Sequence, residues 1–125
     1  MKILVVDDET DIRTLFEQRF RKEIRSGTMH FAFAHSGEDA LGYLNSNVQE
    51  ALLILSDINM PGMSGLQLLE YIKQQYHKPP PVVMMITAYG DPDNYNRAKK
   101  LGADDFLTKP VDFTVLKEKL KFLAS

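Results

Sequence analysis

Hydrophobic and polar positions follow two different periods along the chain. Short segments rich in apolar residues predict five strands, at residues 2–6, 29–34, 52–55, 82–86 and 105–108. Between the strands, apolar residues recur every three or four positions, which predicts five helices, at residues 10–24, 36–44, 64–76, 91–101 and 112–123. Strands that alternate with helices predict an α/β fold with a parallel sheet covered on both faces.

Polar residues mark where four of these helices begin. The expected N-caps are Ser36, Ser64, Asp91 and Asp112. Asp39 follows Ser36, and Gln67 follows Ser64, at the spacing of a capping box. Gly102 supplies the C-terminal stop of the fourth helix. The helix boundaries are therefore predicted by local chemistry as well as by periodicity.

The polarity of the strands predicts their order in the sheet. Residues 2–6, 52–55 and 82–86 are continuously apolar, as expected for interior strands that are buried on both faces. Residues 29–34 and 105–108 are more polar or less bulky and suit the edges. This pattern fits the strand order 2-1-3-4-5 of a doubly wound, flavodoxin-like (βα)5 fold.

Length and composition limit the classes of function. A chain of 125 residues is long enough for one domain with a substantial core, so residues 1–125 are expected to form a single domain. A net charge of −2 argues against direct nucleic-acid binding. The absence of cysteine fits a reducing, cytoplasmic location. The apolar runs are too short to cross a membrane, and the acidic turn after residue 6 is unlike a signal peptide.

Reactive side chains stand where the predicted strands end. Asp7 and Asp8 follow the first strand, Asp57 the third, Thr87 the fourth and Lys109 the fifth. Because the carboxyl ends of parallel strands share one edge of the sheet, these side chains are expected to converge there. The crevice between the first and third strands is also the point at which doubly wound folds bind ligands.

The predicted cluster of carboxylates calls for a cation. Two carboxylates about 5 Å apart repel by roughly 3 kcal/mol at an effective dielectric constant of about 20. Oxygen ligands with room for water favour Mg²⁺. A divalent ion, Lys109 and the Thr87 hydroxyl would favour a phosphoryl group. Asp57 is then the plausible nucleophile, giving an aspartyl phosphate.

Each of these residues also has an ordinary structural explanation when it is taken alone. The Asp7–Asp8 pair could belong to a helix N-cap region, Lys109 could be a solvated loop lysine, and Thr87 could be a turn residue. It is their joint placement at successive strand ends that indicates a functional site.

Four segments carry a resemblance to a known family, and they are 3-ILVVDDE-9, 57-DINMPGMSG-65, 86-ITAYG-90 and 102-GADDFLTKP-110. With them, the chain resembles the receiver domain of two-component response regulators over essentially its whole length, and is similar to the bacterial chemotaxis response regulator. The resemblance implies a signalling switch that accepts a phosphoryl group from a histidine kinase or a histidine phosphotransfer protein onto Asp57.

The resemblance also implies a ligand set for Mg²⁺. Asp8 and Asp57 would coordinate the ion through their side chains and Asn59 through its backbone carbonyl, while Asp7 would act through water. Lys109, Thr87 and the backbone amide of Ala88 are implied to hold the phosphoryl oxygens. The Lys109–Pro110 peptide bond is usually cis in this family.

A conformational switch is implied as well. Thr87 would move toward the phosphoryl group while Phe106, where the family often has tyrosine, would swing inward. Tyr89 would shield the phosphoryl group and, with Asn59, tune its lifetime. The signal would leave through the fourth helix, fifth strand and fifth helix; the thin apolar face of the helix at 91–101 fits an element that shifts.

Three other classes of protein fit the sequence less well. A haloacid dehalogenase-type phosphatase needs a general acid two residues after the nucleophile, where this chain has Asn59. A flavodoxin-like electron carrier needs a phosphate-binding loop after the first strand, where this chain is acidic. A receiver-like docking module that is never phosphorylated would usually have a broken set of acceptor residues, and here the set is complete.

The sequence therefore predicts a phosphorylatable receiver that catalyses only its own phosphoryl transfer and dephosphorylation and is not a metabolic enzyme. No output domain is visible after the last helix. The expected alternatives are a stand-alone regulator, a receiver homodimer or a receiver covalently linked to an output domain.

Overall fold

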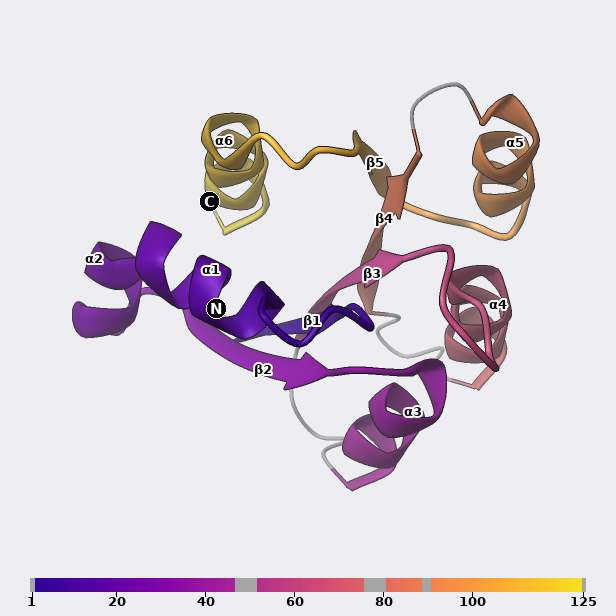
Figure 1. Cartoon of the computed structure of the whole chain (residues 1–125), viewed down its shortest axis with the longest axis horizontal. Helices are drawn as coiled ribbons and strands as arrows, with labels where there is room; N and C mark the ends of the chain where they lie inside the picture. Colours follow the sequence, from indigo (N-terminus) through magenta and orange to yellow (C-terminus); the bar gives the residue numbers. More distant parts are fainter. Residues whose placement is uncertain (1, 47–51, 76–80, 89–90, 125) are drawn as a thin grey trace.

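A computed structural model describes residues 2–46, 52–75, 81–88 and 91–124 (Figure 1). Within these residues, five parallel strands form one sheet in the order β2-β1-β3-β4-β5, which confirms the predicted topology and the predicted edge strands. The strands are β1 (Lys2–Val6), β2 (His30–Ala34), β3 (Leu52–Asp57), β4 (Val82–Thr87) and β5 (Asp105–Thr108).

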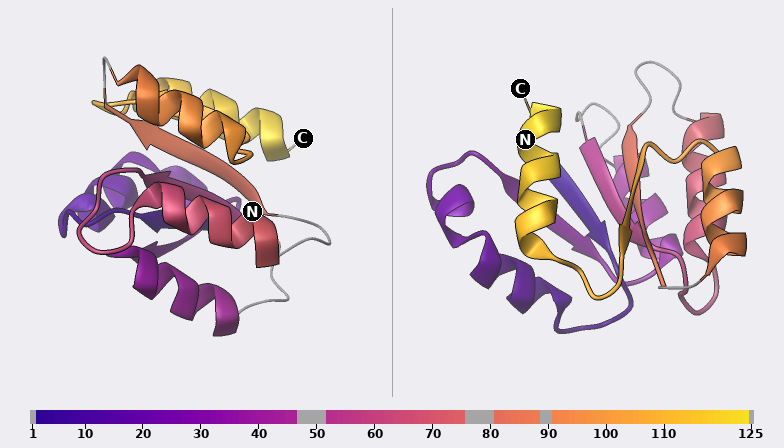
Figure 2. Two further views of the ribbon diagram at one scale, coloured as in Figure 1. Left: turned by 90° about the vertical axis from the view of Figure 1, so that its right-hand side faces the viewer. Right: turned by 90° about the horizontal axis from the view of Figure 1, so that it is seen from above.

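Helices cover both faces of the sheet (Figures 1 and 2). The helices found in the described residues are α1 (Ile12–Arg19), α2 (Arg21–Arg25), α3 (Gly37–Ser46), α4 (Gly65–Gln75), α5 (Pro92–Lys100) and α6 (Phe113–Ala124). Helices α1, α2 and α6 lie on one face, and α3, α4 and α5 lie on the other. In the part of the chain that is described, no helix combines the length and apolar character of a membrane span.

The alternation of side chains along β1 shows how the two faces are built. Ile3 and Val5 belong to the core under α1 and α6, whereas Leu4 and Val6 belong to the core under α3, α4 and α5. All four side chains are buried, as expected for a central strand that is covered on both sides.

The prediction of one continuous helix over residues 10–24 is wrong. The helix is interrupted at Phe20, whose φ of −110° and ψ of 25° lie outside the helical region, so that α1 and α2 are separate elements. The Phe20 ring is fully buried, with its centroid 5.0 Å from that of Phe31 and 6.1 Å from that of Phe113. These long-range contacts fix the Phe20 side chain against β2 and α6, and helical periodicity alone does not report them.

The four expected N-caps are all present. Backbone amides of Asp39, Gln67, Asn94 and Val115 donate to the side chains of Ser36, Ser64, Asp91 and Asp112, respectively. At the start of α4 the capping box is reciprocal, because the Gln67 side chain accepts from the Ser64 amide at 2.9 Å. Gly102 ends α5 with a φ of +99°, in the left-handed region.

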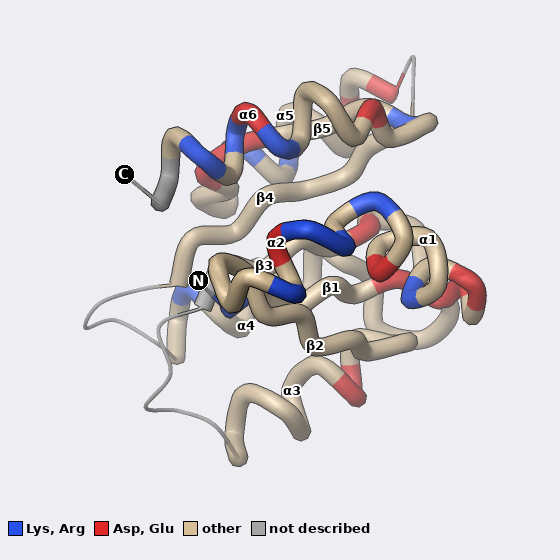
Figure 3. The backbone as a smooth tube through the Cα atoms, turned by 90° about the vertical axis from the view of Figure 1, so that its left-hand side faces the viewer, with Lys and Arg blue, Asp and Glu red and all other residues tan. Residues whose placement is uncertain are grey.

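The face under α1, α2 and α6 is rich in aromatic rings, and basic side chains lie over them. Phe16 contacts Phe20, Phe31, Phe33 and Phe113. Arg19 lies over the Phe113 ring and Lys117 over the Phe20 ring, at 5.5 and 5.3 Å from the centroids. Figure 3 shows the basic residues along α2 and α6 on this side of the molecule.

Candidate functional site

The carboxyl ends of the strands bring distant segments together. The register aligns Val6 with Ser56 on β1 and β3, and Thr87 with Thr108 on β4 and β5. Among the described residues, one group of carboxylates has ligand oxygens that all lie within 4.8 Å of one another, and its members are Asp7, Asp8 and Asp57. The gathering of acidic residues that the sequence predicts is therefore present in the structure.

Asp57 ends β3 and is the most buried of these three residues, with 2% of its surface exposed. Its Oδ2 accepts a hydrogen bond from the Lys109 ammonium at 2.6 Å, and its Oδ1 accepts one from the Asn59 backbone amide at 3.3 Å. Partial burial of Lys109 would by itself lower the pKa of its amine. The hydrogen bond and the negative charge of Asp57 outweigh this effect, so the pKa of Lys109 lies above its ordinary value.

Asp7 lies beside Asp57 at the end of β1 and is also buried, with 3% exposed. Burial is the main cause that raises the pKa of the Asp7 carboxyl, and the charge of Asp57 adds to it. The Glu9 amide, which donates to Asp7 Oδ1 at 3.0 Å, and the Lys109 charge act in the opposite direction. The site thus holds carboxylates that repel one another, and Lys109 is already paired with one of them, Asp57.

This arrangement fits a magnesium ion. The donor set consists of carboxylate oxygens, which are the ligands that Mg²⁺ prefers. Asp8 is exposed, which leaves room for the water molecules that Mg²⁺ retains. Asn59 follows Asp57 by two residues in an exposed position, at the start of the loop that leads to α4. Burial is the main cause of the raised pKa of Asp7, and a bound cation would stabilise the buried carboxylate and offset the repulsion that Asp57 adds.

The backbone around Asp57 is tightly packed. The Gly65 amide donates to the Ile58 carbonyl at 2.8 Å, and a Cβ atom at Gly65 would clash with the Asp57 carbonyl oxygen. Only glycine fits this approach. The Ser56 hydroxyl donates to the same carbonyl oxygen at 3.0 Å, so this buried polar side chain is satisfied by a neighbouring backbone group. These contacts hold the main chain of Asp57 in place.

The predicted switch residues lie on the β4–β5 side of the site. Thr87 is 5% exposed, and its hydroxyl donates to the Leu107 carbonyl at 3.4 Å. Phe106 is half-buried, with its ring centroid 4.3 Å from that of Tyr95 on α5. Ala88 is exposed directly after β4.

Tyr89 lies outside the described residues. The peptide bond between Lys109 and Pro110 is cis, as the family resemblance implies.

Two residues near the site were missed by sequence reasoning. His35 Nδ1 lies 3.2 Å from the Asp7 carbonyl oxygen, and the Glu38 carboxylate accepts from the Met63 amide at 3.1 Å. Both come from the segment after β2, for which no site residue was predicted. Their partners are 28 and 25 positions away along the chain, so no local spacing could have identified them.

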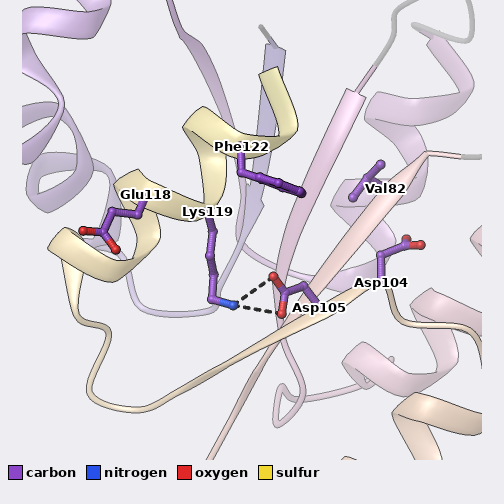
Figure 4. Close-up of a pocket in the computed structure, with 6 residues that line it drawn as sticks. All are labelled: Val82, Asp104, Asp105, Glu118, Lys119 and Phe122. Carbon is purple, nitrogen blue, oxygen red and sulfur yellow. Dashed lines mark hydrogen bonds and ion pairs between the residues drawn. The ribbon is translucent and has the colours of Figure 1, made fainter. Parts of the chain in front are cut away.

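A separate pocket lies at the opposite ends of β4 and β5 (Figure 4). It is lined by Val82, Asp104, Asp105, Glu118, Lys119 and Phe122. Lys119 points across it to Asp105 and forms an ion pair of 2.9 Å. Since none of the predicted site residues lines this pocket, it is distinct from the cluster at the carboxyl ends of the strands.

Comparisons with known proteins show the family to which the sequence is similar. The sequence profile described as "Response regulator receiver domain" matches residues 3–121. The response regulator protein PilR of Pseudomonas aeruginosa is 42% identical over 120 residues, which cover 94% of this chain and 24% of PilR. The DNA-binding transcriptional regulator NtrC of Proteus hauseri is 43% identical over 110 residues, which cover 88% of this chain and 22% of NtrC. The chain thus spans about a quarter of the length of these two relatives.

Solved structures show the same fold. The receiver domain of NtrX from Brucella abortus is 32% identical and superimposes with a TM-score of 0.79, covering 96% of this chain and 95% of that one. The chemotaxis response regulator CheY4 of Vibrio cholerae is 26% identical with a TM-score of 0.78, covering 97% and 96% of the two chains.

Proposed function

The chain belongs to the response regulator receiver domain family, and from this premise we propose that it is a switch that is phosphorylated on Asp57. The observation that supports the proposal best is the surroundings of this carboxylate. It is buried at a strand end, contacts Lys109 at 2.6 Å and lies within 4.8 Å of two further carboxylates.

In the proposed reaction, a carboxylate oxygen of Asp57 attacks the phosphorus atom of a phosphohistidine. The new O–P bond forms as the P–N bond breaks, and the imidazole leaves with the electron pair and takes up a proton. Lys109, with the Thr87 hydroxyl and the Ala88 amide, binds the phosphoryl oxygens and stabilises their charge. Asp57 thus becomes a mixed anhydride that water later hydrolyses, which regenerates the carboxylate and inorganic phosphate.

Asp8 and Asp57 would hold Mg²⁺ through their side chains and Asn59 through its carbonyl, with Asp7 acting through a water molecule. When bound, the ion supplies positive charge that brings the phosphoryl oxygens and the carboxylates together. Asp7 and Asp8 are the residues of this chain that make such binding favourable, because their charges repel that of Asp57 as long as no cation is present.

The proposed output is a movement on the β4–β5 side. The Thr87 hydroxyl, which donates to the Leu107 carbonyl, would turn to a phosphoryl oxygen. Phe106 would then move inward from its contact with Tyr95, and the surface formed by α5, β5 and α6 would change. Asn59 and Tyr89 would tune the lifetime of the phosphorylated state.

The proposed phosphoryl donor is a histidine kinase or a histidine phosphotransfer protein. One relative, NtrC of Proteus hauseri, is a DNA-binding transcriptional regulator and is several times longer than this chain. We propose that this receiver controls an output as a stand-alone regulator, as a homodimer or through a covalently linked output domain, without itself binding nucleic acid or catalysing a metabolic reaction.

Intact-protein mass spectrometry tests the proposal. Incubation with acetyl phosphate and Mg²⁺ should add one phosphoryl group that hydroxylamine removes, as expected for an acyl phosphate. Asp57→Ala should abolish the adduct, and chelation of Mg²⁺ should greatly slow its formation. Asp39→Ala, which removes an exposed carboxylate on α3, is the matched control and should be phosphorylated normally. An adduct that persists in Asp57→Ala would overturn the assignment.

A further inference from the structure

The loop between β3 and α4 is held at its base by main-chain contacts. The Ile58 amide donates to the Ile86 carbonyl, and the Gly65 amide donates to the Ile58 carbonyl. These bonds, together with the close approach of Gly65 to Asp57, fix the two ends of the loop against the sheet. Asn59, whose carbonyl is proposed to bind Mg²⁺, lies just beyond this base.

The tip of the same loop is held from outside, by α3. One carboxylate oxygen of Glu38 accepts a hydrogen bond from the Met63 amide at 3.1 Å. The other oxygen faces Gly62, where a Cβ atom would lie 3.0 Å from it and where φ is +73°. Gly37 lies against the Met63 side chain so closely that a Cβ atom there would be 2.8 Å from it. Two adjacent residues of α3 therefore fit the tip of the loop closely.

We propose that Glu38 is a positioning residue for the magnesium site, acting through the Met63 amide and the loop backbone on the carbonyl of Asn59. The inference rests on the proposed function. Since the base and the tip of the loop are both held, the short segment between them, which includes Asn59, has little freedom to move. Without the contact from Glu38 the tip is released, and ion binding must order the loop as well as displace water.

The hydrogen-bond geometry distinguishes this role from a simple effect of charge. Glu38 acts as an acceptor, so a glutamine side chain, whose carbonyl oxygen is also an acceptor, can replace it without the negative charge. Asp39 carries the same charge on the same first turn of α3, and its own amide bonds back to Ser36. Glu38→Gln and Asp39→Ala therefore separate the contact from the charge.

The test is Mg²⁺ affinity, measured by titration with Mg²⁺ alone and followed by the NMR shifts of the loop amides. Glu38→Ala should weaken binding roughly three- to tenfold, which corresponds to the loss of one exposed hydrogen bond to a supporting group. Glu38→Gln and Asp39→Ala should bind within about twofold of wild type. In the absence of Mg²⁺, the Met63 amide should exchange with solvent faster in Glu38→Ala than in the other two variants.

The outcomes are separable from those of the proposed function. Wild-type protein that does not bind Mg²⁺, or is not phosphorylated on Asp57, would overturn the proposed function. Wild-type Mg²⁺ affinity in Glu38→Ala would overturn the positioning role alone. Equal weakening in Glu38→Ala and Glu38→Gln would do the same, because the effect would then come from charge. A thermal melt of each variant without Mg²⁺ establishes that all are folded.

Discussion

Helices α4 and α5 cover the same face of the sheet but are held very differently. Helix α4 follows the strand that ends in Asp57, and it buries five residues against the sheet, which are Gly65, Leu66, Leu68, Leu69 and Ile72. Helix α5 follows the strand that ends in Thr87, and of its nine residues, all described, Ala98 alone is buried. Tyr95, its large aromatic residue, remains 39% exposed.

This difference separates two tasks that one site must perform. In the proposed function, the Asp57 carboxylate must stay in place for phosphoryl transfer, and the strongly packed α4 holds the chain beside it. The proposed signal requires a movement, and a helix with little buried surface opens or shifts at low free energy. The α4 side of the site therefore carries the proposed phosphoryl acceptor, Asp57, and the weakly packed α5 side carries the proposed response.

The largest expected effect is on α4. Leu69→Ala removes a fully buried side chain and should lower the free energy of unfolding by about 2–5 kcal/mol, whereas Ala98→Gly in α5 should lower it by about 1 kcal/mol. Urea unfolding followed by circular dichroism measures both. A loss in Ala98→Gly as large as that in Leu69→Ala would contradict the contrast between the helices.

A second, smaller effect concerns the buried charge of Asp7, which follows β1. The raised pKa of Asp7 means that its carboxylate is less favourable in the folded protein than in the unfolded chain. Below the unfolded pKa of 3.8, Asp7 is protonated in both states and does not destabilise the folded protein. As the pH rises through the higher folded pKa, the carboxyl must ionise in its buried position, and the free energy of unfolding falls. At pH 7 without Mg²⁺, Asp7→Asn should therefore raise the melting temperature, by a few degrees.

The control for Asp7→Asn is the same melt at a pH below 3.8, where the advantage over wild type should disappear. Added Mg²⁺ should stabilise the wild type more than the variant, because the ion binds the folded state and the variant has lost one carboxylate. A variant less stable than wild type at pH 7 would show that the buried Asp7 carboxylate does not destabilise the folded protein.

The smallest effect is expected on α5. Tyr95→Leu removes the ring that lies 4.3 Å from Phe106 and should lower the free energy of unfolding by at most about 1 kcal/mol. It should nevertheless increase amide exchange in α5 and alter the Phe106 ring signals in NMR spectra. Tyr95→Phe keeps the ring and should behave like wild type. Unchanged exchange in Tyr95→Leu would mean that this contact does not restrain α5.

Much of the fold could be predicted because the relevant signals are local. Continuous apolar runs identified the central strands, and more polar or less bulky segments identified the edge strands. Ser64 with Gln67 marked a helix start at short range. The clustering of Asp7, Asp8 and Asp57 followed from topology, since parallel strands end at one edge.

Other features depend on contacts between distant segments. The helix break at Phe20 arises where its ring packs against β2 and α6. The closeness of Gly65 to Asp57 and the contact from Glu38 to Met63 depend on how the loop after β3 folds back. A hydrophobic pattern indicates that a segment is buried, but it does not identify the atoms that the segment meets.

The two hydrogen bonds to the Asp57 carboxylate have a consequence for its regulation. Lys109 contacts Oδ2 and the Asn59 amide contacts Oδ1, so both oxygens of the resting acceptor already have a protein partner. In the proposed reaction an incoming phosphoryl group replaces one of these two partners of the Asp57 carboxylate. The Lys109 ammonium then moves its contact from the carboxylate to the phosphoryl oxygens. Reaction of Asp57 with small electrophiles should be slow, because Lys109 and the Asn59 amide already occupy its oxygens. A donor with anionic oxygens attracts Lys109 away from the carboxylate and so reacts more readily.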